Sequence, residues 1–158
     1  MKHLPLPKEI KDLFTDLLGR DVEFSTAPPL APGPANPCSV AVYVDDSLEI
    51  SALIVCDLSL SAFAGAALGL IPVGNAQEAV TDGRLSETLS ENLYEVLNIA
   101  ASLFNAPGAT HLRLYDLHPA GGPLDVNLLA RALTLGQRED ATLEIAGYGS
   151  GRVSIVLV

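Results

Sequence analysis

Two pairs of apolar segments, each joined by a short turn sequence, constrain the fold most strongly. Residues 38–44 and 48–56 flank Asp45-Asp46-Ser47, and residues 141–146 and 153–158 flank the sequence GYGSG. Apolar segments bounded by such turn formers are typical of β-hairpins. Because hairpin strands are antiparallel, the sequence predicts an α+β fold in which helices pack on a largely antiparallel sheet, and not a repeated βαβ fold.

Helices are expected where apolar residues recur at helical spacing before a glycine or a proline. In chain order, the other expected elements are a helix at 8–18, a strand at 22–24, helices at 58–70 and 85–105, a strand at 111–118 and a helix at 124–135. Residues 75–83 are expected to be a polar connection in which Thr81 or Asp82 caps the next helix. The small residues Ala62, Gly65, Ala66 and Gly69 allow a neighbouring element to approach helix 58–70 closely.

Residues 27–37, APPLAPGPANP, contain five prolines in eleven residues. Proline donates no backbone hydrogen bond, so this segment is expected to be an extended surface loop. Only 26 residues precede it, and we therefore interpret residues 1–158 as a single domain with an internal loop.

Charge and composition exclude some partners. The net charge is -10, which argues against nucleic acid and against an anionic membrane, and favours a protein partner that offers lysine or arginine. With no apolar run long enough to span a bilayer and no signal-peptide pattern, a cytoplasmic location is expected. Cys38 and Cys56 have no metal-ligand spacing and are expected to be buried free thiols, and the three histidines are too scattered to indicate a metal site.

The expected helix 85–105 separates apolar from polar residues on a helical wheel. The apolar side holds Leu85, Leu89, Leu93, Val96, Leu97, Ala100 and Phe104. The polar side holds Glu87, Glu91, Glu95, Asn98, Ser102 and Asn105. Glu95 and Asn98 are three residues apart, so their side chains project from one place. Asparagine is a poor helix former, so Asn98 either has a function or is an incidental residue of an ordinary amphipathic helix.

Two stretches resemble a known family. A strand leading into a small-residue helix, SALIVCDLSLSAFAGAALGLIP, is followed by a long helix with Glu95-Val-Leu-Asn98 and then Ile99-Ala-Ala-Ser102. This arrangement is similar to the CheC/CheX/FliY family of chemotaxis phosphatases, in which the long helix carries a Glu-x-x-Asn motif. With a single motif, the chain is closest to the CheX-like pattern.

The resemblance implies a CheX/CheC-like fold and a phosphatase that acts on the phosphoaspartate of a CheY-type receiver domain. Glu95 would pair with a lysine of the receiver, Asn98 would position the attacking water, and Glu91 and Ser102 would complete the partner-binding surface. No cofactor is expected on this chain, because the phosphorylated partner would bring Mg²⁺. Ser102 stands where the family often has glycine, which leaves a non-catalytic interaction module of the same fold as the alternative.

A homodimer is also expected. The segment VSIVLV, residues 153–158, carries no charge that would protect an exposed sheet edge. Pairing with a second copy would cover such an edge, and the resemblance to CheX proteins, which dimerise through their sheets, points the same way.

Overall fold

A six-stranded sheet forms the centre of the computed structural model, which describes residues 1–158. Its strands are β1 (Val22–Thr26), β2 (Cys38–Val44), β3 (Ile50–Asp57), β4 (Arg113–His118), β5 (Arg138–Ile145) and β6 (Gly149–Leu157). Their order across the sheet is β1-β5-β6-β3-β2-β4, and every neighbouring pair is antiparallel. The predicted antiparallel α+β fold and both predicted hairpins are therefore confirmed.

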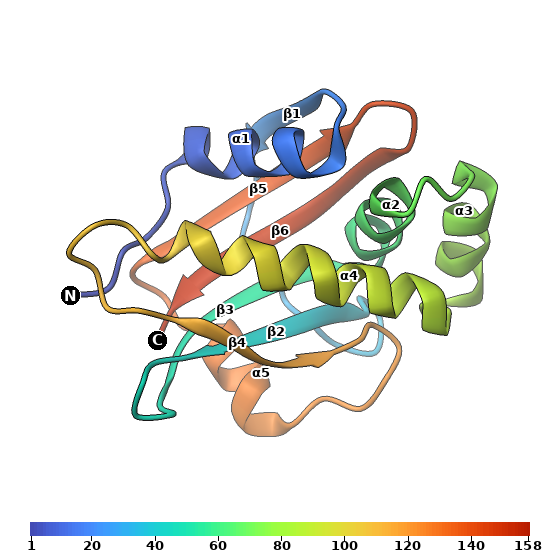
Figure 1. The fold of residues 1–158 in the computed structure, drawn as a ribbon. Helices are drawn as coiled ribbons and strands as arrows, with labels where there is room; N and C mark the ends of the chain where they lie inside the picture. Colours follow the sequence, from blue (N-terminus) through green and yellow to red (C-terminus); the bar gives the residue numbers. More distant parts are fainter.

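Helices cover both faces of this sheet. They are α1 (Pro7–Leu18), α2 (Leu58–Leu68), α3 (Val73–Asp82), α4 (Glu87–Ile99), the 3₁₀ turn η1 (Ala100–Leu103) and α5 (Val126–Ala132). In Figure 1, α1, α2 and α4 lie on one face, and α4 crosses the strands in front of the sheet. The short helix α5 lies on the opposite face, where it packs against β3 and β2. None of the helices is long and apolar enough to cross a bilayer.

The two covered faces give two apolar cores. The larger core joins α1, α2 and α4 to one side of the sheet, including Tyr43 of β2. The smaller core lies under α5 and includes Leu30 of the proline-rich segment and Val42 of β2. Burial on both faces explains why β2, apart from Ser39, is apolar and does not alternate with polar residues. The prediction that Cys38 and Cys56 are buried free thiols is confirmed.

Residues 75–83 differ from the sequence prediction. They belong to α3, which begins after Pro72 and ends at Gly83 in a left-handed conformation. Ala76 and Ala79 are its only buried residues, so the apolar stripe was too narrow to identify the helix from the sequence. The cap of α4 was also predicted wrongly, since it is the Ser86 side chain that accepts a hydrogen bond from the Leu89 N–H.

The position of β6 overturns the edge argument for a homodimer. β6 lies between β5 and β3 in the middle of the sheet, and the edge strands are β1 and β4. The uncharged segment 153–158 is therefore paired on both sides within the chain. A homodimer stays a prediction, but the sequence of β6 no longer supports it.

The helices α2 and α4 approach each other closely, as the small residues of α2 predicted. A Cβ atom added at Gly65 would lie 2.7 Å from the backbone oxygen of Leu89. The Asn92 side chain of α4 donates a hydrogen bond of 3.0 Å to the Gly65 carbonyl of α2. This contact fixes α4 against the rest of the molecule.

Candidate functional site

The exposed face of α4 carries Glu95 and Asn98. Both side chains are exposed, while Leu93, Val96 and Leu97 of the same helix are buried in the larger core. The predicted orientation of the helix is therefore confirmed. The exposed face also carries Glu87 and Glu91, and α4 has no lysine, arginine or histidine.

The asparagines of this segment separate into two that the fold explains and one that it does not. Asn92 binds the Gly65 carbonyl. Asn105 binds both backbone groups of Leu112, donating to its oxygen at 2.9 Å and accepting from its N–H at 2.8 Å. The Asn98 side chain has no hydrogen-bond partner within the chain. Asn98 lies near the end of α4, and its low helix propensity does not stabilise that helix.

Asn105 was predicted on the same polar stripe as Asn98, and this prediction is wrong. The α-helix ends at Ile99 and continues as the 3₁₀ turn η1 over Ala100–Leu103. The tighter turn adds a larger angle at each residue, so the deviation from the wheel calculated for an α-helix accumulates along η1 and is greatest after it. Asn105 lies beyond η1, where it is half-buried and holds the following loop.

The backbone next to Asn98 is held from below by Tyr43 of β2. Its hydroxyl donates a hydrogen bond of 2.5 Å to the carbonyl of Leu97. Tyr43 is fully buried, and its ring lies 5.0 Å from that of Phe104. Burial raises the pKa of Tyr43 well above its usual value of 10, so the hydroxyl stays protonated and remains a donor. The sheet therefore fixes the helix where Asn98 projects from it.

The electrostatics of this face favour a cation. Glu95 and Asn98 lie in the C-terminal half of α4, where the helix dipole places partial negative charge. Glu87 and Glu91 add two further carboxylates to the same face. A free phosphate would be repelled here, whereas a partner that presents a lysine or a bound metal ion would be attracted. The neutral amide of Asn98 is the group on this face that can approach an anion without repulsion and both donate and accept a hydrogen bond.

The two further residues predicted to bind a partner lie along the same surface. Glu91 is exposed one turn before Glu95, and Ser102 is exposed on η1, one turn after Asn98. The structure thus brings all four predicted site residues to one side of the molecule. Their roles in binding and catalysis stay predictions.

A shallow hollow beside these residues was not predicted. It has a volume of about 310 Å³ and is lined by Ser90, Glu91 and Tyr94 of α4 and by Leu117 and Pro119 at the end of β4. The helical wheel places Tyr94 on the exposed side, so this residue could have been found from the sequence. Leu117 and Pro119 could not, because their proximity depends on how α4 crosses β4.

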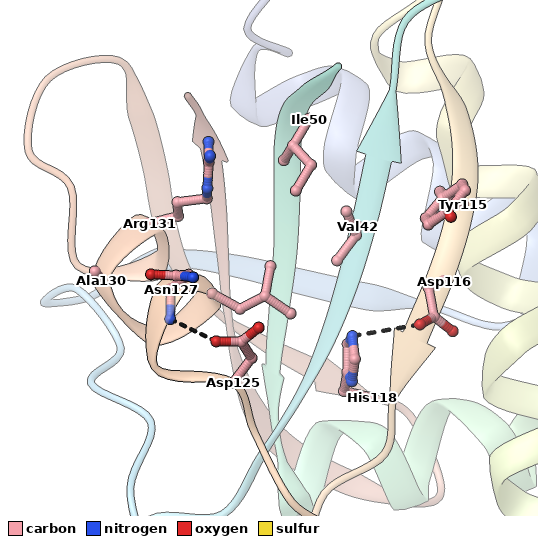
Figure 2. A pocket seen from close by; sticks show the side chains of 10 residues that line it. Val42, Ile50, Tyr115, Asp116, His118, Asp125, Asn127, Ala130 and Arg131 are labelled. Atoms are coloured by element: carbon pink, nitrogen blue, oxygen red, sulfur yellow. Dashed lines mark hydrogen bonds and ion pairs between the residues drawn. The ribbon is translucent and has the colours of Figure 1, made fainter. Parts of the chain in front are cut away.

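A larger hollow lies on the opposite face of the sheet, between β4 and α5 (Figure 2). Its volume is about 560 Å³, and Val42 and Ile50 form part of its apolar floor. His118 lies 3.5 Å from Asp116, and Asp125 accepts a hydrogen bond from the Asn127 N–H as the cap of α5. The lining shows no nucleophile beside a base, and no three metal-ligating side chains of the chain lie together. We therefore place the candidate site on α4.

Comparison with known proteins establishes the fold. No protein-family model matches the chain, and no curated protein matches its sequence. Among solved structures, a chain of the FliG–FliM complex from H. pylori superposes with a TM-score of 0.58 at 13% identity, covering 98% of this chain and 87% of that chain. The FliM middle domain from Vibrio alginolyticus gives 0.57 at 12% identity, covering 95% and 86%. A chemotactic CheC-like protein from Shewanella oneidensis gives 0.50 at 10% identity, covering 96% and 95%.

The chain has the fold shared by FliM and CheC-like proteins. The resemblance to the CheC/CheX/FliY family that the sequence suggested is confirmed at the level of the fold. At identities of 10 to 13%, these structures establish the architecture, and the function has to be argued from the residues on α4.

Proposed function

We propose that this protein hydrolyses the phosphoaspartate of a CheY-type receiver domain, with Glu95 and Asn98 as the residues that act on the partner. One observation carries the proposal. Asn98 is an exposed helix residue without a partner in the chain, beside Glu95, whereas Asn92 and Asn105 both have structural hydrogen bonds.

The chemistry suits these two side chains. Water attacks the phosphorus, the P–O bond to the aspartyl oxygen breaks, and inorganic phosphate and a carboxylate are formed. A carboxylate leaves as an anion without needing a proton near neutral pH, so the site requires no general acid. The amide of Asn98 would accept a hydrogen bond from the water and hold it in line with the breaking bond, which is much of what phosphoryl transfer requires.

Glu95 would orient the complex. Its carboxylate would pair with a lysine of the receiver and so bring Asn98 to the phosphoryl group. The Mg²⁺ of the receiver would neutralise the phosphoryl oxygens, and the partner would thus supply the positive charge that α4 lacks. The negative face of α4 supports this division, because it attracts the cationic side of the partner.

A non-catalytic interaction module is the second candidate, and the comparisons supply a specific reason for it. The FliM structures superpose with higher TM-scores than the CheC-like protein, and FliM was solved in complexes with FliG and with SpeE. A domain of this fold can therefore serve to hold another protein. In that function Glu95 would still bind a basic partner, but Asn98 would not be needed for turnover.

The experiment that separates the two functions uses a CheY-type receiver from the same genome, phosphorylated by a small phosphodonor with Mg²⁺. The loss of the phosphoryl group is followed with and without this protein. Acceleration that falls about 100-fold or more in the Asn98→Ala variant supports the phosphatase. The matched control is Asn127→Ala, which removes an exposed asparagine of α5 on the other face of the sheet. Binding without acceleration supports the interaction module.

A further inference from the structure

Tyr94 lies beside the candidate site, and the fold does not explain it. It directly precedes Glu95 and is four residues before Asn98, so the side chains of Tyr94 and Asn98 are neighbours on the helix surface. The residue is 43% exposed. Its ring forms one wall of the hollow of about 310 Å³ between α4 and the end of β4.

The two tyrosines that are less exposed than Tyr94 each have a structural partner. The Tyr43 hydroxyl donates to the Leu97 carbonyl, and the Tyr148 hydroxyl donates to the Ile71 carbonyl at 2.7 Å. The Tyr94 hydroxyl has no hydrogen bond within the chain. An amphipathic ring that is half in water and beside a hollow is the arrangement that tyrosine adopts at protein interfaces.

The charges around the hollow specify what can enter it. Leu117, Pro119 and the Tyr94 ring provide apolar surface, while Glu91 lies on the rim and Glu95 follows one turn later. Since α4 has no basic residue, no charge of the helix neutralises these carboxylates. The hollow therefore fits an apolar side chain that has lysine or arginine residues next to it, and it disfavours an anionic ligand.

We propose that the Tyr94 hollow is a second docking point for the receiver protein, which inserts an apolar side chain there while its lysine pairs with Glu95. This inference rests on the proposed function and adds a residue that sets affinity. A central apolar anchor with a charged rim is the usual anatomy of a protein interface, and truncation of such an anchor weakens binding. Because Tyr94 acts on binding and Asn98 on the reaction, their variants should differ in kinetics.

The first test is a titration of the receiver against the wild type and three tyrosine variants. Tyr94→Ala is expected to raise the half-saturating receiver concentration about tenfold with no change in the maximal rate. Tyr94→Phe keeps the ring and is expected to stay close to the wild type. Tyr115→Ala is the control, since Tyr115 is also exposed but lines the hollow on the other face of the sheet.

A second test reads the contact directly and does not depend on turnover. The chain has four tyrosines, so labelling with 3-fluorotyrosine gives four fluorine resonances, and Tyr94→Phe and Tyr115→Phe assign two of them. Addition of the receiver with Mg²⁺ and beryllium fluoride is expected to shift or broaden the Tyr94 resonance and to leave that of Tyr115 unchanged.

The outcomes separate this inference from the function on which it rests. If Asn98→Ala loses activity while Tyr94→Ala keeps the wild-type half-saturation and the Tyr94 resonance does not move, the docking point is wrong and the phosphatase stands. If the wild-type protein neither binds the receiver nor accelerates the loss of its phosphoryl group, both proposals are overturned.

Discussion

Replacing Asn98 by alanine is expected to stabilise the fold slightly while it removes the proposed activity. The Asn98 side chain is exposed and has no hydrogen bond within the chain, so its removal leaves no buried group without a partner. Alanine has the better helix propensity, by up to about 0.7 kcal/mol. The expected change is a gain of about 0.5 kcal/mol in the free energy of unfolding.

Asn105→Ala is the variant with which the stability of Asn98→Ala is compared, because Asn105 is an asparagine with a structural role. The Asn105 amide makes two hydrogen bonds, to the N–H and to the carbonyl of Leu112, a residue that is 1% exposed. Each bond contributes about 0.5 to 1.5 kcal/mol, and a buried backbone group left without its partner costs about 1 to 3 kcal/mol. We expect Asn105→Ala to lose about 2 to 4 kcal/mol.

Urea denaturation followed by circular dichroism measures both variants against the wild type. The slope with denaturant should stay constant, so that the midpoints report stability alone. In thermal unfolding, each kcal/mol corresponds to about 2 to 4 °C for a chain of this size, so Asn98→Ala should unfold about 1 to 2 °C higher and Asn105→Ala about 4 to 16 °C lower. A loss of more than about 1 kcal/mol in Asn98→Ala would refute the reasoning, because the amide would then have a structural role.

Three further predictions concern binding, packing and thiol chemistry. Glu95→Ala should mainly raise the half-saturating receiver concentration, by about fivefold for a partly wet ion pair, and titrations at low and high salt should show the difference shrinking as salt screens the pair. Gly65→Ala should lower the free energy of unfolding by about 1 to 2 kcal/mol, measured by urea denaturation, because its Cβ would meet the α4 backbone. Gly74→Ala is the control and should be neutral or stabilising, because no atom lies within 4 Å of its Cβ position. Equal gains in both variants would disprove the close contact. Burial raises the pKa of Cys38 to about 12 and also raises the pKa of Cys56, so both thiols stay protonated at pH 8. A disulfide reagent should therefore label two thiols per chain in urea and neither thiol in the folded protein. Rapid labelling without urea would contradict this prediction.

The sequence predicted the parts of the fold that depend on local patterns. Both hairpins and α4 were found because their turn residues and apolar periodicity lie within short segments. The helix α3 was missed because only Ala76 and Ala79 are buried, and alanine is a weak signal of an apolar stripe. The central position of β6 was missed because strand order depends on pairing between segments that are far apart in the chain.

The same distinction applies to the candidate site. Glu95 and Asn98 were placed correctly, because both lie within one regular helix and helical periodicity is enough to predict that their side chains are exposed. Asn105 was misplaced because the change from α to 3₁₀ geometry at Ala100 has no sequence signal of its own. The hollow at Tyr94 required the crossing of α4 over β4, which is a tertiary contact.

The central position of β6 also has a consequence for how the chain folds. β6 joins the pair β1-β5 to the group β3-β2-β4, so the sheet consists of two parts until Gly149–Leu157 has paired with both neighbours. During synthesis, β1 cannot pair until β5 has been made, about 120 residues later, and the apolar strand β3 cannot pair with β6 until about 100 residues have followed it. In that interval the open edge of β3 can pair with other chains. Substitutions that slow the pairing of β6 should therefore increase aggregation and lower the yield of folded protein, even where the finished molecule tolerates them.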